Sequence, residues 1–168
     1  MEKPCKDLVK LAKQGDRQAF GELYSLYSTE LYKYACYILG SSQLAQDAVQ
    51  EAVCCAYAQI SKLRNEDAFK SWLFKILSNT CKRIISTKKE YHLEDNEYIC
   101  DFDRFDFEIS IELAIAMEKL KPEERMVLIL SSVYGYKSRE ISENLNCSAS
   151  TVRSKLSRAL KKLRYELE

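Results

Sequence analysis

Residues that break helices are scarce in this chain, which has only 4 glycines and 2 prolines among its 168 residues. A sheet architecture with many turns needs more of both, whereas Leu, Lys, Glu, Ala and Ser, which abound here, favour long helices. A chain of this length buries about two-thirds of the surface that its unfolded form exposes, so it can form one or two compact domains. We therefore predict an all-α protein.

The first half of the chain shows the apolar spacing of helices. We expect helices near residues 5–13, 17–39, 43–62 and 67–87. Gly40 would end the second helix, Ser41 and Ser42 would cap the third, and Asp67 would cap the fourth.

The second half contains a helix-turn-helix pattern. Helices over 109–120 and from Pro122 to Gly135 come before a short helix over 137–145. Asn146 tolerates a left-handed turn, and Ser148 is placed to cap the final helix. The apolar residues of that helix recur at spacings of 3 and 4, so we expect one stripe to face its companion: Val152, Leu156, Ala159, Leu160 and Leu163.

Charge divides the chain into three parts, although the formal net charge is only +1. Residues 1–89 hold 14 basic and 9 acidic side chains, residues 90–108 hold 1 and 8, and residues 109–168 hold 11 and 8. The acidic part has no clear helical period and repels itself, which suits an extended connection. We therefore predict two helical domains, 1–89 and 109–168, joined by an acidic linker over 90–108.

Two stretches, 68–89 and 144–165, each hold six basic residues and no acid. A solvated helix face usually mixes signs, because opposite charges four residues apart stabilise it. Uncompensated runs therefore indicate an external anion, and two of them indicate nucleic-acid phosphate. A basic amphipathic helix that docks on an acidic protein or a membrane surface is the alternative.

Side chains beside the apolar stripe of the final helix can reach a DNA major groove. They are Ser150, Thr151, Arg153, Ser154, Ser157 and Arg158. We predict that Arg153 and Arg158 read bases, because a bidentate arginine–guanine pair contributes about 1–3 kcal/mol of discrimination. The remaining cations would lie over phosphates, each steepening the salt dependence by about 0.9 log unit: Lys155, Lys161, Lys162 and Arg164.

Composition argues against an enzyme, a metal site or a cofactor. Seven cysteines, an odd number without C-x-x-C spacing, suggest neither a disulfide framework nor a zinc site, and we expect them to be mainly reduced core residues. His92 is the only histidine, and no glycine-rich phosphate loop is present. The sequence has no run of about 18 apolar residues, and its N-terminus lacks the apolar core of a signal peptide. We therefore expect a cytoplasmic protein without membrane insertion.

Three segments resemble parts of bacterial sigma factors of the sigma-70 family, particularly the extracytoplasmic-function (ECF) group. REISENLNCSASTVRSKLSRALKKLR resembles the region 4 helix-turn-helix. LAQDAVQEAVCCAYAQI resembles the region 2 motif that binds core polymerase, and AFKSWLFKILSNTCKRIISTKK resembles the helix that recognises and melts the minus-10 element. The resemblance spans residues 5–167 and implies a region 2 domain over 1–89 and a region 4 domain over 109–168 that binds the minus-35 element.

The resemblance implies roles for residues of the first domain. One helix face presents Leu44, Asp47, Gln50 and Glu51, which would contact the clamp helices of the polymerase; an ordinary solvated face is the alternative. The loop 63–68 would pocket a flipped base, and the predicted minus-10 contacts are Arg64, Asn65, Lys75, Asn79, Lys82 and Arg83. The linker would thread through polymerase channels and mimic nascent RNA, or serve only as a solvated spacer.

The leading hypothesis is a non-catalytic specificity subunit that binds core RNA polymerase, recognises promoter DNA and helps open the duplex. The resemblance also implies an anti-sigma factor, either soluble or membrane-anchored, that would wedge between or clamp the two domains. A dimeric helix-turn-helix regulator of a palindrome is the second hypothesis, and it predicts tight DNA binding by the isolated chain. A nucleic-acid enzyme would need a metal constellation that the sequence does not show.

Overall fold

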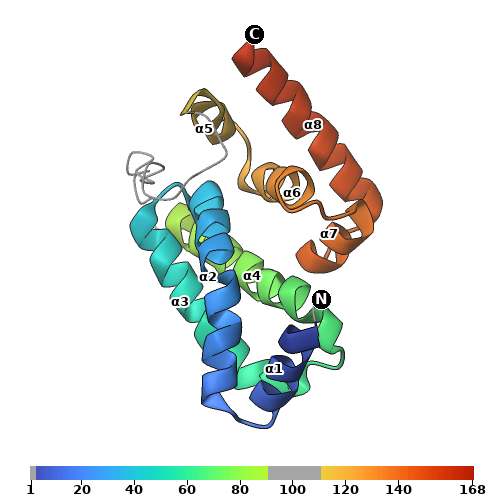
Figure 1. Ribbon diagram of the computed structural model, residues 1–168. Coiled ribbons are helices and arrows are strands. Elements are labelled where there is room, and N and C mark those ends of the chain that lie inside the picture. The colour runs from blue at the N-terminus through green and yellow to red at the C-terminus, as the bar shows by residue number, and fades with distance from the viewer. Residues whose placement is uncertain (1–2, 91–110) are drawn as a thin grey trace.

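A computed structural model describes residues 3–90 and 111–168 of the chain (Figure 1). Every element within these two ranges is a helix, as the sequence predicts. The first range contains α1 (Lys3–Lys13), α2 (Arg17–Leu39), α3 (Ser42–Gln59), the 3-10 turns η1 (Ile60–Lys62) and η2 (Glu66–Ala68), and α4 (Phe69–Glu90). The second contains α5 (Ile111–Glu118), α6 (Pro122–Ser132), α7 (Ser138–Leu145) and α8 (Ala149–Leu167). Most of the predicted acidic linker, from residue 91 onward, lies outside the described residues.

Local capping sets both ends of α2 and the start of α3. The Asp16 carboxylate caps α2 by accepting a hydrogen bond from the Ala19 N–H at 3.1 Å. Ser41, rather than Ser42, caps α3, because the Ser41 hydroxyl accepts a hydrogen bond from the Leu44 N–H at 3.4 Å. Gly40 ends α2 in the left-handed conformation that favours glycine, with φ at 66°.

The predicted cap at Asp67 is wrong. Helix α4 begins at Phe69, and Asp67 lies inside η2. The Asn65 side chain accepts a hydrogen bond from the Asp67 N–H at 3.0 Å and so starts the turn two residues earlier. The Asp67 carboxylate instead accepts from the Lys6 Nζ at 2.7 Å.

Helices α2 and α4 pack against each other at the centre of the first half of the chain, residues 3–90. The Tyr34 and Phe74 rings are fully buried and meet edge to face, with centroids 5.5 Å apart. The Tyr34 hydroxyl lies 2.8 Å from the Ser78 hydroxyl, so this buried polar group has a partner. Phe69 and Leu77 of α4 are fully buried as well.

Helices α7 and α8 form the predicted helix-turn-helix. Asn146 joins them in the left-handed conformation, with φ at 52° and ψ at 51°. Ser148 caps α8 by accepting a hydrogen bond from the Thr151 N–H at 3.1 Å. Val152 is buried as expected, but Leu160 is 48% exposed, so its assignment to the buried stripe is wrong. It lies about 80° round the helix from Val152, outside the packed side.

The two halves of the chain pack against each other, with α6 beside α2 and α7 beside α4 (Figure 1). Arg125 of α6 is only 8% exposed and donates a hydrogen bond to the Ile38 carbonyl at 3.1 Å. The Tyr134 hydroxyl donates to the Glu30 carbonyl at 2.8 Å, and its ring lies 4.9 Å from that of Phe74, centroid to centroid. We call this the closed arrangement of the two halves.

Candidate nucleic-acid and polymerase interfaces

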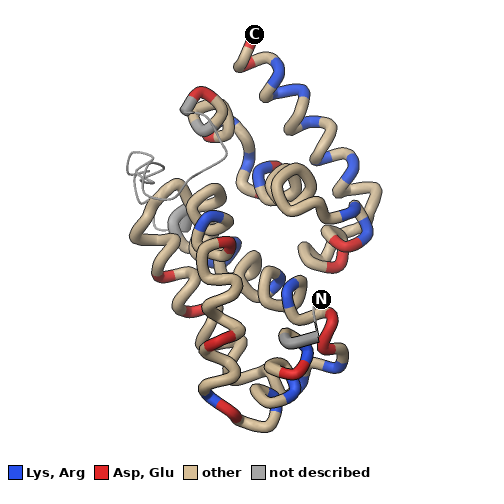
Figure 2. Tube along the Cα trace, in the orientation of Figure 1, with Lys and Arg blue, Asp and Glu red and all other residues tan. Residues whose placement is uncertain are grey.

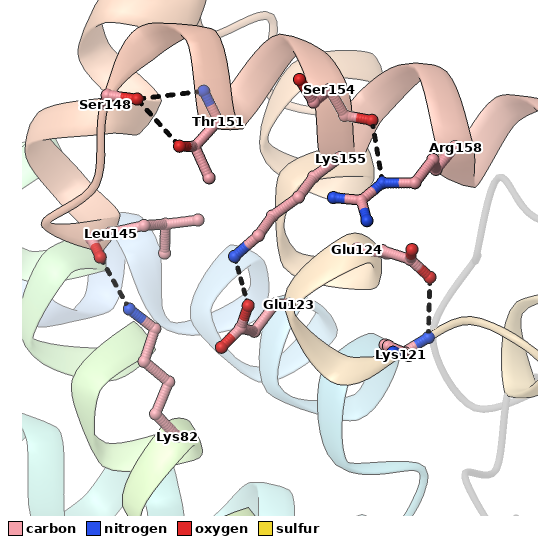
Figure 3. A network of polar contacts seen from close by, with 10 residues as sticks. All are labelled: Lys82, Lys121, Glu123, Glu124, Leu145, Ser148, Thr151, Ser154, Lys155 and Arg158. Atoms are coloured by element: carbon pink, nitrogen blue, oxygen red, sulfur yellow. Dashed lines mark hydrogen bonds and ion pairs between the residues drawn. The ribbon is translucent and has the colours of Figure 1, made fainter.

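Helix α8 presents a long cationic face to solvent, and Figure 2 shows Lys and Arg at intervals along most of the helix, up to its acidic C-terminal end. The exposed residues of this face are Ser150, Arg153, Ser154, Ser157, Arg158 and Lys161, and Thr151 is half-buried beside them. The Arg158 Nε donates to the Ser154 carbonyl at 3.3 Å, which holds the arginine against the helix surface (Figure 3). The structure therefore brings most of the predicted minus-35 residues to one accessible face.

Lys155 and Lys162 lie on the side of α8 that faces α6. Lys155 pairs with Glu123, and the Lys162 Nζ lies 2.7 Å from the Glu124 Oε2 (Figure 3 shows the first pair). Glu124 also accepts from the Lys121 N–H at 3.1 Å and so caps α6. Burial opposes ionisation of Glu124, but the hydrogen bonds from Lys162 and Lys121 hold its pKa below the ordinary value. These lysines orient α8 on α6, and their contact with phosphate stays a prediction.

The predicted minus-10 residues are divided between α4 and the loop before it. Asn79 is exposed on α4, and Lys75 is half-buried on the same helix. Arg64 and Asn65 are exposed in the loop 63–68, whose shape is set by the Asn65 side chain in its cap of η2. The loop and the exposed part of α4 are thus both open to solvent.

Lys82 and Arg83, two other predicted minus-10 residues, are held by neighbouring elements. The Lys82 Nζ donates to the Leu145 carbonyl at the end of α7, at 3.0 Å (Figure 3). Burial lowers the pKa of the Lys82 ammonium group. Arg83 pairs with Glu51 of α3. Lys82 therefore joins the two halves, and Arg83 joins the predicted minus-10 helix to the predicted polymerase-binding helix.

The predicted polymerase-binding residues lie on α3. Asp47 and Gln50 are exposed, whereas Leu44 and Glu51 are half-buried. Their helical spacing places them on one side of α3, where an apolar side chain lies among two carboxylates and an amide. This side can accept both apolar and polar contacts from a protein partner.

A groove of about 570 Å³ lies between α2 and α3, next to this side. It is lined by Tyr24, Ser28, Thr29, Tyr32, Gln46, Val49, Gln50, Val53 and Cys54. Sequence reasoning missed the α2 wall, although Tyr24, Ser28 and Tyr32 recur every four residues, the spacing of one helix face. Gln50 belongs both to the groove and to the predicted polymerase-binding side.

A second groove, of about 560 Å³, runs along α8. Its apolar side chains are Leu156 and Leu160, and three cations border them: Arg153, Lys161 and Arg164. The exposed position of Leu160 therefore gives the cationic face of α8 an apolar strip.

Within residues 3–90 and 111–168, no three or more His, Cys, Asp or Glu side chains gather in a way that could hold a metal ion. The helices of these ranges include none with the length and apolar character needed to cross a membrane. Cys5, Cys36 and Cys81 are buried, as expected for core cysteines, whereas Cys54 is exposed.

Comparison with known families assigns both halves of the chain. The Sigma-70 region 2 model matches residues 23–90, and the Sigma-70 region 4 model matches residues 110–163. The ECF RNA polymerase sigma factor SigW of Bacillus subtilis (strain 168) is 29% identical over 184 residues, covering 99% of this chain and 98% of SigW. The chain belongs to the ECF group of the sigma-70 family.

Other relatives agree with this assignment. The ECF RNA polymerase sigma-E factor of Haemophilus influenzae is 27% identical over 178 residues, covering 96% of this sigma factor and 94% of the relative. The fold of this sigma factor is similar to that of CnrH, which was solved in complex with the cytosolic domain of CnrY. The two structures superpose with a TM-score of 0.73 and are 23% identical in sequence, and the match covers 98% of this chain and 97% of CnrH. As a sigma factor, this protein directs RNA polymerase to promoters.

Proposed function

We propose that this sigma factor binds core RNA polymerase through α3, reads the minus-35 element through α8 and reads the minus-10 element through α4 and the loop 63–68. The proposal depends most on α8, a capped helix of a helix-turn-helix that carries no acid before Glu166. The protein would work in the cytoplasm as a specificity subunit that needs no cofactor, while the polymerase performs the chemistry.

At the minus-35 element, Arg153 and Arg158 are the proposed base readers. Both are exposed on α8, and each guanidinium offers the paired N–H donors that match the acceptors of guanine. The serines and Thr151 on the same face can contact bases or phosphates. Lys161 is exposed beside them and can lie over the DNA backbone.

At the minus-10 element, α4 and the loop before it would hold an unpaired base. Taking a base out of the stack costs a few kcal/mol, which protein contacts must offset. Arg64, Asn65 and Asn79 are all exposed and can supply such contacts. Recognition of the element and melting of the duplex would then be energetically linked.

The closed arrangement would make the free protein a weak DNA binder. Lys82 donates to the Leu145 carbonyl, and the Asn144 Nδ2 donates to the Ser71 carbonyl at 3.3 Å, so α7 lies against α4. A DNA strand that follows α4 must compete with these contacts. We propose that binding to core polymerase separates the two halves and exposes Lys82.

An anti-sigma factor is the second proposed protein partner. Two proteins of similar fold were solved with protein partners: CnrH with the cytosolic domain of CnrY, and the sigma factor RpoE with the anti-sigma factor NepR from Bartonella quintana. A soluble or membrane-anchored inhibitor of this sigma factor would wedge between or clamp the two halves. It would thereby hide the surfaces for polymerase and promoter together.

A mobility-shift assay with and without core polymerase tests the proposed function. We expect a duplex promoter fragment to shift strongly only when core polymerase is present. Tight binding by the isolated chain, as a dimer on a palindrome, would instead support the regulator hypothesis.

Variants of each surface test the division of roles. Changing Arg153 and Arg158 to Ala should abolish minus-35-dependent transcription and leave core binding intact, while Arg17→Ala, an exposed arginine on α2, should change neither. Asp47→Ala with Glu51→Ala should weaken core binding. Because Glu51→Ala also releases Arg83, Asp47→Ala alone is the cleaner variant. Loss of core binding in the arginine variant, or unchanged core affinity in the α3 variants, would contradict these assignments.

A further inference from the structure

Helix α1 is tied to the loop that would read the minus-10 element. The Lys6 Nζ lies 2.7 Å from the Asp67 Oδ2, and the Lys13 Nζ lies 2.6 Å from the Glu66 Oε1. Both acids belong to η2, directly after Asn65. These ion pairs join segments more than 50 residues apart in sequence, because η2 packs against α1. Helix α1 also lies before residue 23, where the match to the region 2 family model begins.

The contacts constrain the backbone of the loop next to its exposed readers. Asp67 is held twice, since its N–H donates to the Asn65 side chain while its carboxylate accepts from Lys6. The Lys13 and Glu66 side chains are only 24% and 27% exposed, so solvent screens this pair less than a fully exposed one. The hydrogen bond from Lys13 also lowers the pKa of Glu66, so its carboxylate stays charged.

The ion pairs also change the charge that DNA would meet. The loop 63–68 contains one basic residue, Arg64, and two acids. Unpaired carboxylates beside a phosphate backbone would repel it and would draw Arg64 toward themselves. Paired with Lys6 and Lys13, the acids are neutralised on the α1 side.

We infer that Lys6 and Lys13 are positioning residues for the minus-10 element: α1 holds and neutralises Glu66 and Asp67 so that Arg64 and Asn65 can receive an unpaired base. This inference rests on the proposed role of the loop. Neither lysine needs to touch DNA, because each acts through its acidic partner.

A charge swap in the assembled polymerase tests this inference. The probe is a promoter fragment selected from random duplex DNA with the wild-type holoenzyme, and the measurement is permanganate reactivity of its unpaired thymines. Lys13→Glu should reduce melting about threefold to fivefold, the effect expected from losing a partly exposed pair. Lys13→Arg should preserve melting, and Lys13→Glu combined with Glu66→Lys should restore it. Core affinity should stay unchanged throughout.

Lys10→Glu is the matched control, because it makes the same change in charge without removing a contact to the loop: Lys10 pairs within α1 with Asp7 at 3.8 Å and acts on Glu66 only through its electrostatic field, so its effect should be smaller than that of Lys13→Glu. Equal effects of Lys10→Glu and Lys13→Glu, or failure of the swap to restore melting, would overturn the inference. Asn65→Ala in the same assay tests the proposed role of the loop separately from the role of α1. If it leaves melting unchanged, the proposed role of the loop fails; if it impairs melting while Lys13→Glu does not, only the role of α1 fails.

Discussion

Arg125→Met should loosen the closed arrangement. In the protein, the buried Arg125 guanidinium donates to the Ile38 carbonyl at 3.1 Å and to the Tyr37 carbonyl at 3.5 Å. Both carbonyls lie in the last turn of α2, which has no basic residue of its own. Arg125 therefore brings a cation to the negative end of the α2 dipole. Methionine keeps the apolar stem and removes every donor.

The magnitude follows from these contacts. One hydrogen bond from a charged donor contributes about 1.5–3 kcal/mol, and we assign little to the second because 3.5 Å is long. A cation at a helix C-terminus adds about 0.3–1 kcal/mol. A loss of about 2 kcal/mol from the closed arrangement corresponds to an approximately 30-fold shift toward separated halves.

Fluorescence anisotropy with a labelled promoter duplex measures the consequence in the free protein. Apparent affinity is proportional to the fraction of molecules that are competent to bind. Free Arg125→Met should therefore bind up to about 30-fold more tightly than wild type, and its radius of gyration in solution scattering should rise. Arg17→Met, the same change at an exposed position, should alter neither quantity. If Arg125→Met binds DNA no more tightly although the halves separate, closure is not what limits DNA binding.

Substitutions at three other positions test local parts of the fold. Asn146→Ala should lower the free energy of unfolding by about 1 kcal/mol, because φ is 52° there, whereas Asn146→Gly should be neutral or stabilising; urea denaturation compares the two. Ser148→Ala should cost about 1 kcal/mol by removing the α8 cap and should weaken minus-35 duplex binding in the holoenzyme, and equal stability would contradict the capping role. Tyr34→Phe should cost about 1 kcal/mol in thermal unfolding, since Ser78 keeps its bond to the Phe74 carbonyl while the Tyr34 bond is lost.

Features set by neighbouring residues were predictable from the sequence. The left-handed Asn146 and the cap at Ser148 depend on a few adjacent side chains, and both predictions are confirmed. The predicted cap at Asp67 is wrong because Asn65 starts a 3-10 turn that contains Asp67, and because Lys6, far away in sequence, binds the Asp67 carboxylate. The ion pair with Lys6 is a tertiary contact that a local pattern does not contain.

The site was only partly predictable for the same reason. Helical spacing places Arg153 and Arg158 on the exposed face of α8, as expected. It does not reveal that Lys155 faces Glu123 or that Lys82 reaches the end of α7, because those partners come from other helices. Helical spacing also does not show that Arg125 binds carbonyl groups of the other half. Every residue has a backbone carbonyl, so the sequence does not indicate which of them accepts a hydrogen bond.

Transcription in vitro from a random-sequence DNA library tests the central claim most directly. Core polymerase supplied with this protein should initiate from fragments that share two sequence blocks, one near minus 35 and one near minus 10. The variant with Arg153 and Arg158 changed to Ala should lose the requirement for the upstream block alone. Initiation from the same fragments with and without the protein would contradict the account.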